Sequence, residues 1–182
     1  DLHRVDRRQR QMCIRDRAYF EVTKDEARCF NVIMEGATIE VMGTSFNASC
    51  YPGEGQCWAV LESGKINLRT DHGVAAVNVG ECASYDIASG KVTVEAVDLK
   101  YFTSWRYGTF YFYNTPLSEI VQKLGRWYDV HFKFADESLR DVCFSGAALR
   151  SKPIDFMLEL LSSTQSLKFD IQSDGMIMIY KK

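Results

Sequence analysis

The chain has 182 residues, of which 46% are hydrophobic and 25% charged, a balance that is typical of soluble globular domains and excludes a largely disordered chain. The formal net charge is −2, but residues 1–17 carry six Arg and three Asp, so the rest of the chain is acidic and lacks the electrostatic footprint of a nucleic-acid-binding protein. No apolar run reaches the roughly 18 residues that cross a membrane, so the sequence predicts no transmembrane helix, and no signal peptide is recognisable.

Residues 1–17 differ from the rest of the chain because they have few apolar residues and no useful periodicity. A basic arm for an anionic surface is one interpretation of this segment. The other is a disordered or non-native tail, since residues 12–17 resemble translated adapter sequence. We therefore predict a non-native or disordered tail over 1–17 and exclude it from the predicted fold.

Residues 18–98 consist of short β-rich runs separated by turns that contain glycine. Such runs, spaced about 8 to 12 residues apart, predict an all-β domain, either a sandwich or a stacked β-roll. The predicted strands are 19–22, 30–34, 38–42, 45–51, 58–61, 65–69, 74–79, 82–87 and 92–97.

The cysteines do not form a metal-binding pattern, because no two of them are spaced as C-x-x-C and the chain has only three His. We therefore predict no metal site. Cys50 and Cys57 could be bridged if they flank a hairpin in an oxidising compartment, and otherwise most cysteines are expected to be small, reduced, apolar residues. The six cysteines are Cys13, Cys29, Cys50, Cys57, Cys82 and Cys143.

After a short helical connector at 99–106, residues 107–182 contain one pattern written twice, which predicts a β-α-β-β-α-β-β module. Thr115 is the expected N-cap of the first helix, with Pro116 at its first position. The last strand is apolar on both faces and is therefore expected at the centre of a sheet. The predicted strands are 109–113, 130–134, 142–144, 167–171 and 176–180, and the predicted helices run over 116–128 and 154–161.

Seven short motifs in this order resemble the periplasmic part of the FecR-type family of iron-dicitrate sensor-like anti-sigma regulators, in the form common in Bacteroidota. They extend from the first predicted strand to the end of the first helix of the C-terminal module. The motifs are AYFEV at 18–22, VMGTSFN at 41–47, VLESGKI at 60–66, GECA at 80–83, TSW at 103–105, FYNTPL at 112–117 and RWYDV at 126–130.

The resemblance implies a FecR domain over 18–98 and a C-terminal domain over 107–182 that is similar to the N-terminal signalling domains of secretins and TonB-dependent receptors. It implies a periplasmic fragment of a protein anchored in the inner membrane, without its transmembrane helix and its cytoplasmic segment for a sigma factor. The implied partner is the signalling domain of a TonB-dependent outer-membrane receptor, and no cofactor is implied.

The first functional hypothesis is a protein interface, because an exposed strand edge can pair with a strand of a partner. The predicted edge comprises Val142, Cys143, Phe144 and Ser145. Trp127 is a candidate hot-spot residue of the same interface. An ordinary edge without a partner remains the alternative for this strand.

Two other hypotheses remain open, and neither is conventional catalysis, for which the sequence offers no convincing residue set. Self-cleavage between Gly43 and Thr44 would use the Thr hydroxyl to attack the Gly carbonyl, with no base identifiable from the sequence. A carbohydrate-binding β-module would use exposed aromatic side chains, although core packing explains most aromatic positions more simply.

Overall fold

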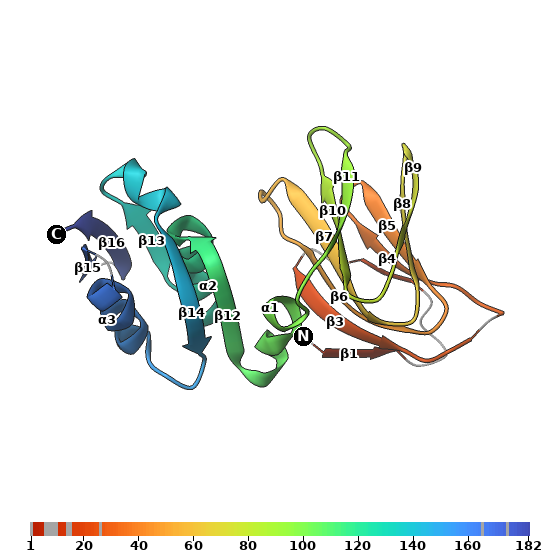
Figure 1. Ribbon diagram of the computed structural model, residues 1–182, viewed down its shortest axis with the longest axis horizontal. Helices are drawn as coiled ribbons and strands as arrows, with labels where there is room; N and C mark the ends of the chain where they lie inside the picture. Colours follow the sequence, from red (N-terminus) through yellow and green to blue (C-terminus); the bar gives the residue numbers. More distant parts are fainter. Residues whose placement is uncertain (1, 6–10, 14–15, 26, 165, 174) are drawn as a thin grey trace. The chain divides into compact units, whose positions relative to one another are not determined.

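The computed structural model describes residues 2–5, 11–13, 16–25, 27–164, 166–173 and 175–182. The chain divides into two compact units, Asp1–Thr103 and Ser104–Lys182, and the division falls within the predicted connector. Both units are rich in β-strands, and the longer helices lie in the second (Figure 1). None of the helices in the described ranges combines the length and apolarity that a membrane crossing requires.

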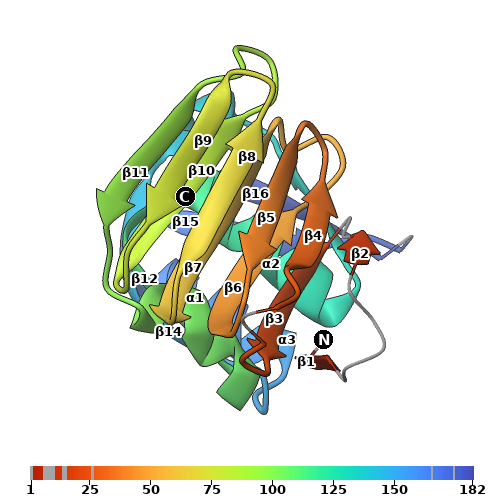
Figure 2. The same cartoon turned by 90° about the vertical axis from the view of Figure 1, so that its right-hand side faces the viewer.

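The N-terminal unit contains two β-sheets that face each other, so that the sandwich is the correct alternative of the two predicted (Figure 1). Figure 2 looks onto the unit and shows β4, β5, β8 and β9 side by side. The six-stranded sheet has the order β1 (Leu2–Val5), β3 (Arg17–Val22), β6 (Thr44–Cys50), β7 (Gln56–Ser63), β10 (Glu81–Asp86) and β11 (Val92–Ala96). The five-stranded sheet has the order β2 (Gln11–Cys13), β4 (Phe30–Met34), β5 (Ala37–Val41), β8 (Ile66–Thr70) and β9 (Gly73–Val77).

Alternating apolar residues of both sheets form the core of the sandwich. Every second residue of β4 and β5 is buried, which is the pattern of strands with one face on a core. Phe20 of β3 stacks on Phe46 of β6 with ring centroids 4.8 Å apart, and it meets Phe30 of the opposite sheet at 6.1 Å. These rings connect the two sheets through apolar contact that is excluded from water.

One end of the sandwich carries several connections that take the chain from one sheet to the other. The links from β3 to β4, from β5 to β6 and from β7 to β8 all lie there, because the register pairs Val22 with Thr44 and Phe30 with Val41. Gly43 and Gly64 stand in two of these links, with φ values of +152° and +91°. The Gly43–Thr44 bond is therefore part of a tightly packed crossing point.

Part of the segment predicted as a tail does not follow that prediction. Leu2–Val5 forms β1, which pairs in parallel with β3, and Gln11–Cys13 forms β2, which pairs in parallel with β4. These residues pair with the edge strands of both sheets, which offer unpaired backbone groups to them, and so do not follow the disordered alternative; that the segment is non-native stays a prediction. Residues 6–10 and 14–15 of the predicted tail lie outside the described residues.

A disulfide joins Cys50 and Cys57, so the expectation that most cysteines are reduced does not extend to this pair. Cys50 ends β6 and Cys57 lies at the start of β7, directly opposite each other across a hairpin. Their Cα atoms are 4.3 Å apart, close to the lower end of the range that a disulfide spans. The other four cysteines are free.

The predicted helical connector is present as α1 (Lys100–Thr103) and a 3₁₀ turn, η1 (Ser104–Tyr107). α1 is attached to the six-stranded sheet of its own unit. The amide of Asn47, which is fully buried, donates a hydrogen bond of 2.6 Å to the carbonyl of Phe102. The Trp58 ring meets the Phe102 ring edge-on, with centroids 5.3 Å apart.

The elements of the C-terminal unit follow the predicted order. β16 lies at the centre of its sheet, as its apolar faces predicted. A two-stranded sheet pairs β12 (Thr109–Pro116) with β14 (Cys143–Leu149), and a three-stranded sheet has the order β13 (His131–Phe134), β16 (Met176–Lys181) and β15 (Leu167–Ile171). The helices are α2 (Leu117–Tyr128), α3 (Ile154–Thr164) and the 3₁₀ helix η2 (Glu137–Asp141).

α2 has the predicted buried stripe, but its N-terminus is not capped as predicted. Pro116 occupies the cap position, and no side chain caps the helix. Thr115 instead belongs to β12 and donates its hydroxyl to the carbonyl of Tyr113. Pairing of β12 with β14 extends through Pro116, so long-range strand pairing replaces the local cap. The buried side chains of α2 are Leu117, Ile120, Val121 and Leu124.

Candidate functional site

β14 is an edge strand, and it contains most of the segment predicted as an edge. Among the described strands, β14 pairs only with β12, in an antiparallel register that matches Phe112 with Gly146 and Thr115 with Phe144. A bulge lies between Phe112 and Thr115, with Asn114 at a φ of +45°. One side of β14 is therefore available for strand pairing.

The register shows which backbone groups point to the open side. The N–H of Leu117 donates to the carbonyl of Val142, and the N–H of Arg150 donates to the carbonyl of Gly108, so these two pairs are directed between the strands. Direction alternates along an antiparallel strand. The backbone N–H and C=O groups of Cys143, Ser145, Ala147 and Leu149 consequently point away from β12.

The side chains of the predicted edge divide between the core and the surface. Phe144 is only 7% exposed and belongs to the core of the unit, and Val142 is half-buried against it. Cys143 and Ser145 are exposed. The Ser145 hydroxyl accepts a hydrogen bond of 2.8 Å from the N–H of Asn114, so it holds the bulge of β12. The buried Phe144 side chain anchors β14 to the core, and the exposed side chains of Cys143 and Ser145 lie on the outer face of the strand.

Trp127 does not lie beside the predicted edge segment. Its ring meets Phe110 edge-on, with centroids 6.1 Å apart. Phe110 is paired with Ala148, which is four positions along β14 from Phe144, or roughly 13 Å at the rise of a strand. Trp127 is half-buried at the margin of the core and therefore packs mainly within its own unit.

Sequence reasoning missed two aromatic residues on the outer face of β12. Tyr111 and Tyr113 are 38% and 73% exposed, whereas the alternate residues Phe110 and Phe112 are buried. Tyr111 is the cross-strand partner of Ala147. The strict alternation of Phe and Tyr in 110–113 was the signal that could have identified them, because alternation separates a core face from a solvent face.

The Gly43–Thr44 bond is enclosed by neighbouring backbone. The Thr44 hydroxyl donates to the carbonyl of Lys65 at 2.9 Å and accepts from the N–H of Lys65 at 3.4 Å, and Thr44 is 3% exposed. A Cβ added to Gly64 would lie 2.5 Å from the Gly43 carbonyl oxygen, and one added to Gly43 would lie 2.5 Å from the Cα of Lys24. Thr44 thus links two connections between the sheets.

A groove of about 670 Å³ lies beside this bond, and its titratable groups are not arranged as a catalytic pair. A two-point contact from Arg69 holds the pKa of the Glu40 carboxyl below its usual value. Burial, with Glu40 as a second cause, raises the pKa of the Cys29 thiol. Elsewhere in the unit, burial raises the pKa of Cys82 to about 11, which disfavours its thiolate.

We expect Thr44→Val to lower the free energy of unfolding of the N-terminal unit by about 1 kcal/mol, because it removes the hydroxyl that bonds to the backbone N–H and C=O of Lys65. Thr44→Ser keeps the hydroxyl and should lose less. Chemical denaturation measures both variants. Mass spectrometry of the purified proteins tests self-cleavage in parallel: fragments ending at Gly43 in the wild type but not in Thr44→Val would support it, and an intact wild-type chain would contradict it.

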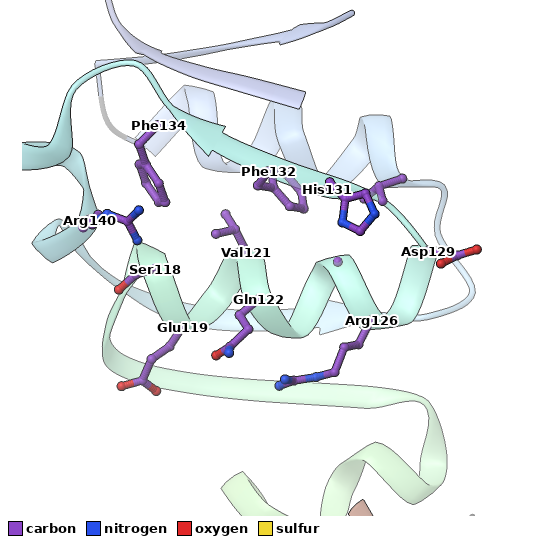
Figure 3. A pocket seen from close by; sticks show the side chains of 12 residues that line it. Ser118, Glu119, Val121, Gln122, Arg126, Asp129, His131, Phe132, Phe134 and Arg140 are labelled. Carbon is purple, nitrogen blue, oxygen red and sulfur yellow. The ribbon is translucent and has the colours of Figure 1, made fainter. Parts of the chain in front are cut away.

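A second groove, of about 560 Å³, lies in the C-terminal unit between α2 and β13. Figure 3 shows Val121 of α2 facing Phe132 and Phe134 of β13, with Arg140 beside Phe134. α2 lies close to the residue that precedes β13, because a Cβ added at Gly125 would lie 2.8 Å from the carbonyl oxygen of Val130. The groove contains charges of both signs and has an apolar wall, so its lining favours neither a cation nor an anion.

Within the described ranges, no group of three or more His, Cys, Asp or Glu side chains is placed to hold a metal ion. The described chain is a β-sandwich followed by an α+β unit, and β14 and β15 are edge strands of the two sheets of the second unit.

Residues 109–178 match the family described as FecR, C-terminal. This match lies within the predicted C-terminal domain, and it confirms the resemblance to FecR-type anti-sigma regulators. No curated protein matches the chain.

Two crystal structures of a candidate anti-sigma factor from Parabacteroides distasonis ATCC 8503 are similar to this chain. The first has a TM-score of 0.84 and 22% sequence identity, and the match covers 95% of this chain and 81% of the other. The second has a TM-score of 0.81 and 22% identity, over 97% of this chain and 83% of the other. At this level of identity the likeness establishes the fold.

Proposed function

We propose that this chain is the periplasmic sensor part of a transmembrane anti-sigma factor. It relays the state of a TonB-dependent outer-membrane receptor to an extracytoplasmic-function sigma factor through protein–protein contact. The observation that carries the proposal is the open edge of β14, where Cys143, Ser145 and Ala147 direct their backbone groups away from β12. The proposed partner is the signalling domain of such a receptor, for which the C-terminal unit supplies a similar module.

The family match and the disulfide support a periplasmic location. Residues 109–178 match the FecR C-terminal family. The Cys50–Cys57 disulfide is of a kind that persists in oxidising compartments and is rare in a reducing cytosol. The full-length protein is anchored in the inner membrane by a segment that precedes these residues, and its cytoplasmic part contacts the sigma factor.

Strand addition at β14 has a physical consequence for the C-terminal unit. Two strands alone form a marginal sheet, and a third strand stabilises it. The added strand would extend the β12–β14 sheet next to the exposed rings of Tyr111 and Tyr113, which are residue types that dominate interface energetics. The bond from Leu117 to Val142 joins the edge to the first turn of α2, so partner binding also orders that turn.

Ala147→Pro tests this surface directly. Proline removes the outward N–H of residue 147 and leaves the bonds to β12 in place, as it can on an edge strand. We expect binding of the full chain to the signalling domains of receptors encoded beside it to weaken about tenfold, measured by titration calorimetry. Tyr113→Ala should weaken the same binding, because it removes an exposed aromatic contact.

The matched control is Ile171→Pro, which places the same substitution at an outward N–H on the edge of the other sheet of this unit. It should leave receptor binding unchanged. Equal binding by Ala147→Pro and the wild type would refute the β14 surface. Binding retained after deletion of residues 107–182 would move the contact to the β-sandwich.

A further inference from the structure

β15 is an edge strand of the three-stranded sheet in the C-terminal unit, a different sheet from the one that contains β14. Among the described strands it pairs only with β16, and Figure 1 shows both strands beside α3. The N–H of Gln172 donates to the carbonyl of Met176, and the N–H of Lys182 donates to the carbonyl of Ser166, each at 2.8 Å. By alternation, Leu167, Phe169 and Ile171 direct their backbone groups to the open side of the sheet.

The side chains of β15 are self-complementary about Phe169. Lys168 and Asp170 flank it, and both are exposed on the outer face of the sheet. On the inner face Leu167 is buried, Phe169 is half-buried and Ile171 is 55% exposed. A two-fold rotation about Phe169 exchanges the positions of Lys168 and Asp170. The same rotation exchanges the positions of Leu167 and Ile171, which are both apolar.

We propose that β15 pairs antiparallel with β15 of a second copy of this chain, in a two-fold register centred on Phe169. The register makes Phe169 its own partner and matches Leu167 with Ile171 of the second copy, so that all outward N–H and C=O groups of these residues meet a partner. Lys168 then faces Asp170 of the second copy in a non-hydrogen-bonded pair, where side chains approach most closely. The two three-stranded sheets become one continuous sheet.

The charges on β15 favour a second β15 as the partner strand, and they favour the register centred on Phe169 over the neighbouring registers. A two-fold register centred on Leu167 would place Lys168 opposite Ser166, and one centred on Ile171 would place Asp170 opposite Gln172, so neither joins opposite charges. β13, the other edge of the same sheet, carries His131 and Lys133 on its outer face and would place two basic side chains opposite each other. β15 is thus the edge of this sheet that complements itself.

Apolar contact adds to the charge pairing. Ile171 and Phe169 line a hollow of about 400 Å³ with Leu158 of α3. In the proposed register, Ile171 of each copy lies next to Leu167 of the other, which removes its exposed surface from water. The surface is separate from the β14 edge, so the dimer and the proposed receptor contact do not compete for the same strand.

Charge reversal tests the pairing by complementation. Lys168→Asp alone and Asp170→Lys alone each place like charges opposite each other at both ends of the register. We expect each to raise the dissociation constant of the dimer about tenfold in sedimentation measurements at low salt. An equimolar mixture of the two variants pairs opposite charges and should dimerise as the wild type does. Lys133→Asp, a matched charge reversal at the far edge of the sheet, should leave the dimer unchanged.

The double variant Lys168→Asp/Asp170→Lys restores the complementary order within one chain and should dimerise, which separates loss of pairing from loss of folding. Ile171→Pro removes an outward N–H and should weaken the dimer, whereas Ala147→Pro should not. A wild-type chain that stays monomeric at all concentrations would overturn the proposal. A dimer unaffected by either single charge reversal, or one that the mixture fails to restore, would also overturn it.

Discussion

Gly64→Ala is expected to lower the free energy of unfolding of the N-terminal unit by about 3 to 5 kcal/mol. Gly64 has a φ of +91°, and a Cβ at this position would lie 2.5 Å from the carbonyl oxygen of Gly43 and 2.8 Å from the Thr44 hydroxyl. Backbone cannot move aside as a flexible side chain can. The methyl group therefore forces apart two connections that carry the chain between the sheets. Chemical denaturation followed by circular dichroism measures the loss.

Gly53→Ala is the matched control for this prediction. Gly53 has a similar φ of +81°, but a Cβ there meets no atom within 4 Å. Gly53→Ala should therefore lower the free energy of unfolding by only about 1 kcal/mol, the cost of placing alanine in a left-handed backbone conformation. Equal losses in the two variants would show that backbone conformation alone matters, and would contradict the close approach of Gly64 to Gly43.

Leu124→Ala is expected to lower the free energy of unfolding of the C-terminal unit by about 2 to 5 kcal/mol, because it leaves a cavity where a fully buried side chain stood. Leu124 lies on the buried stripe of α2 and belongs to the core of this unit. Small domains have little stability in reserve, so the change should also abolish binding through β14 at physiological temperature. Differential scanning calorimetry measures the stability, and titration calorimetry measures the binding.

Gln122→Ala provides the control on the same helix. Gln122 is exposed, and alanine is the best helix former. The free energy of unfolding of the C-terminal unit should therefore change by less than about 0.5 kcal/mol. Receptor binding should also persist in this variant. If Gln122→Ala destabilised the unit as much as Leu124→Ala, the burial pattern of α2 would be wrong.

Much of the fold was predictable because burial on one face leaves a period in the sequence. The predicted strand 38–42 corresponds to β5, where alternate residues are buried, and the predicted helix 116–128 matches α2 apart from its first residue. The central position of β16 followed from its apolar residues on both faces. These features depend on local pattern, and local pattern is what a single sequence contains.

The features that sequence reasoning missed depend on long-range pairing. Thr115 has the character of an N-cap, but β12 extends through it because Pro116 pairs with Cys143. The pairing of Leu2–Val5 with β3 could not be derived, because residues 1–17 have few apolar residues and no useful periodicity. The Cys50–Cys57 bridge required the hairpin register as well as the redox environment.

The candidate site was predictable as a strand edge but not in its detail. A short strand between two βα units indicated the edge at residues 142–145. Which backbone groups point outward depends on the register and on the bulge at Asn114, although Asn is a residue that favours such a conformation. The position of Trp127 depends on its contact with Phe110, and no local spacing specifies that contact.

The central place of β16 determines when the C-terminal unit can form during synthesis. β13 and β15 bind to β16 on either side and have no bond to each other, so their sheet cannot assemble before residues 176–181 have emerged into the compartment where the unit folds. The sandwich strands are complete by residue 96 and can fold earlier. A nascent chain halted before residue 176 would hold two strands without their common neighbour, and such strands are vulnerable to aggregation and proteolysis.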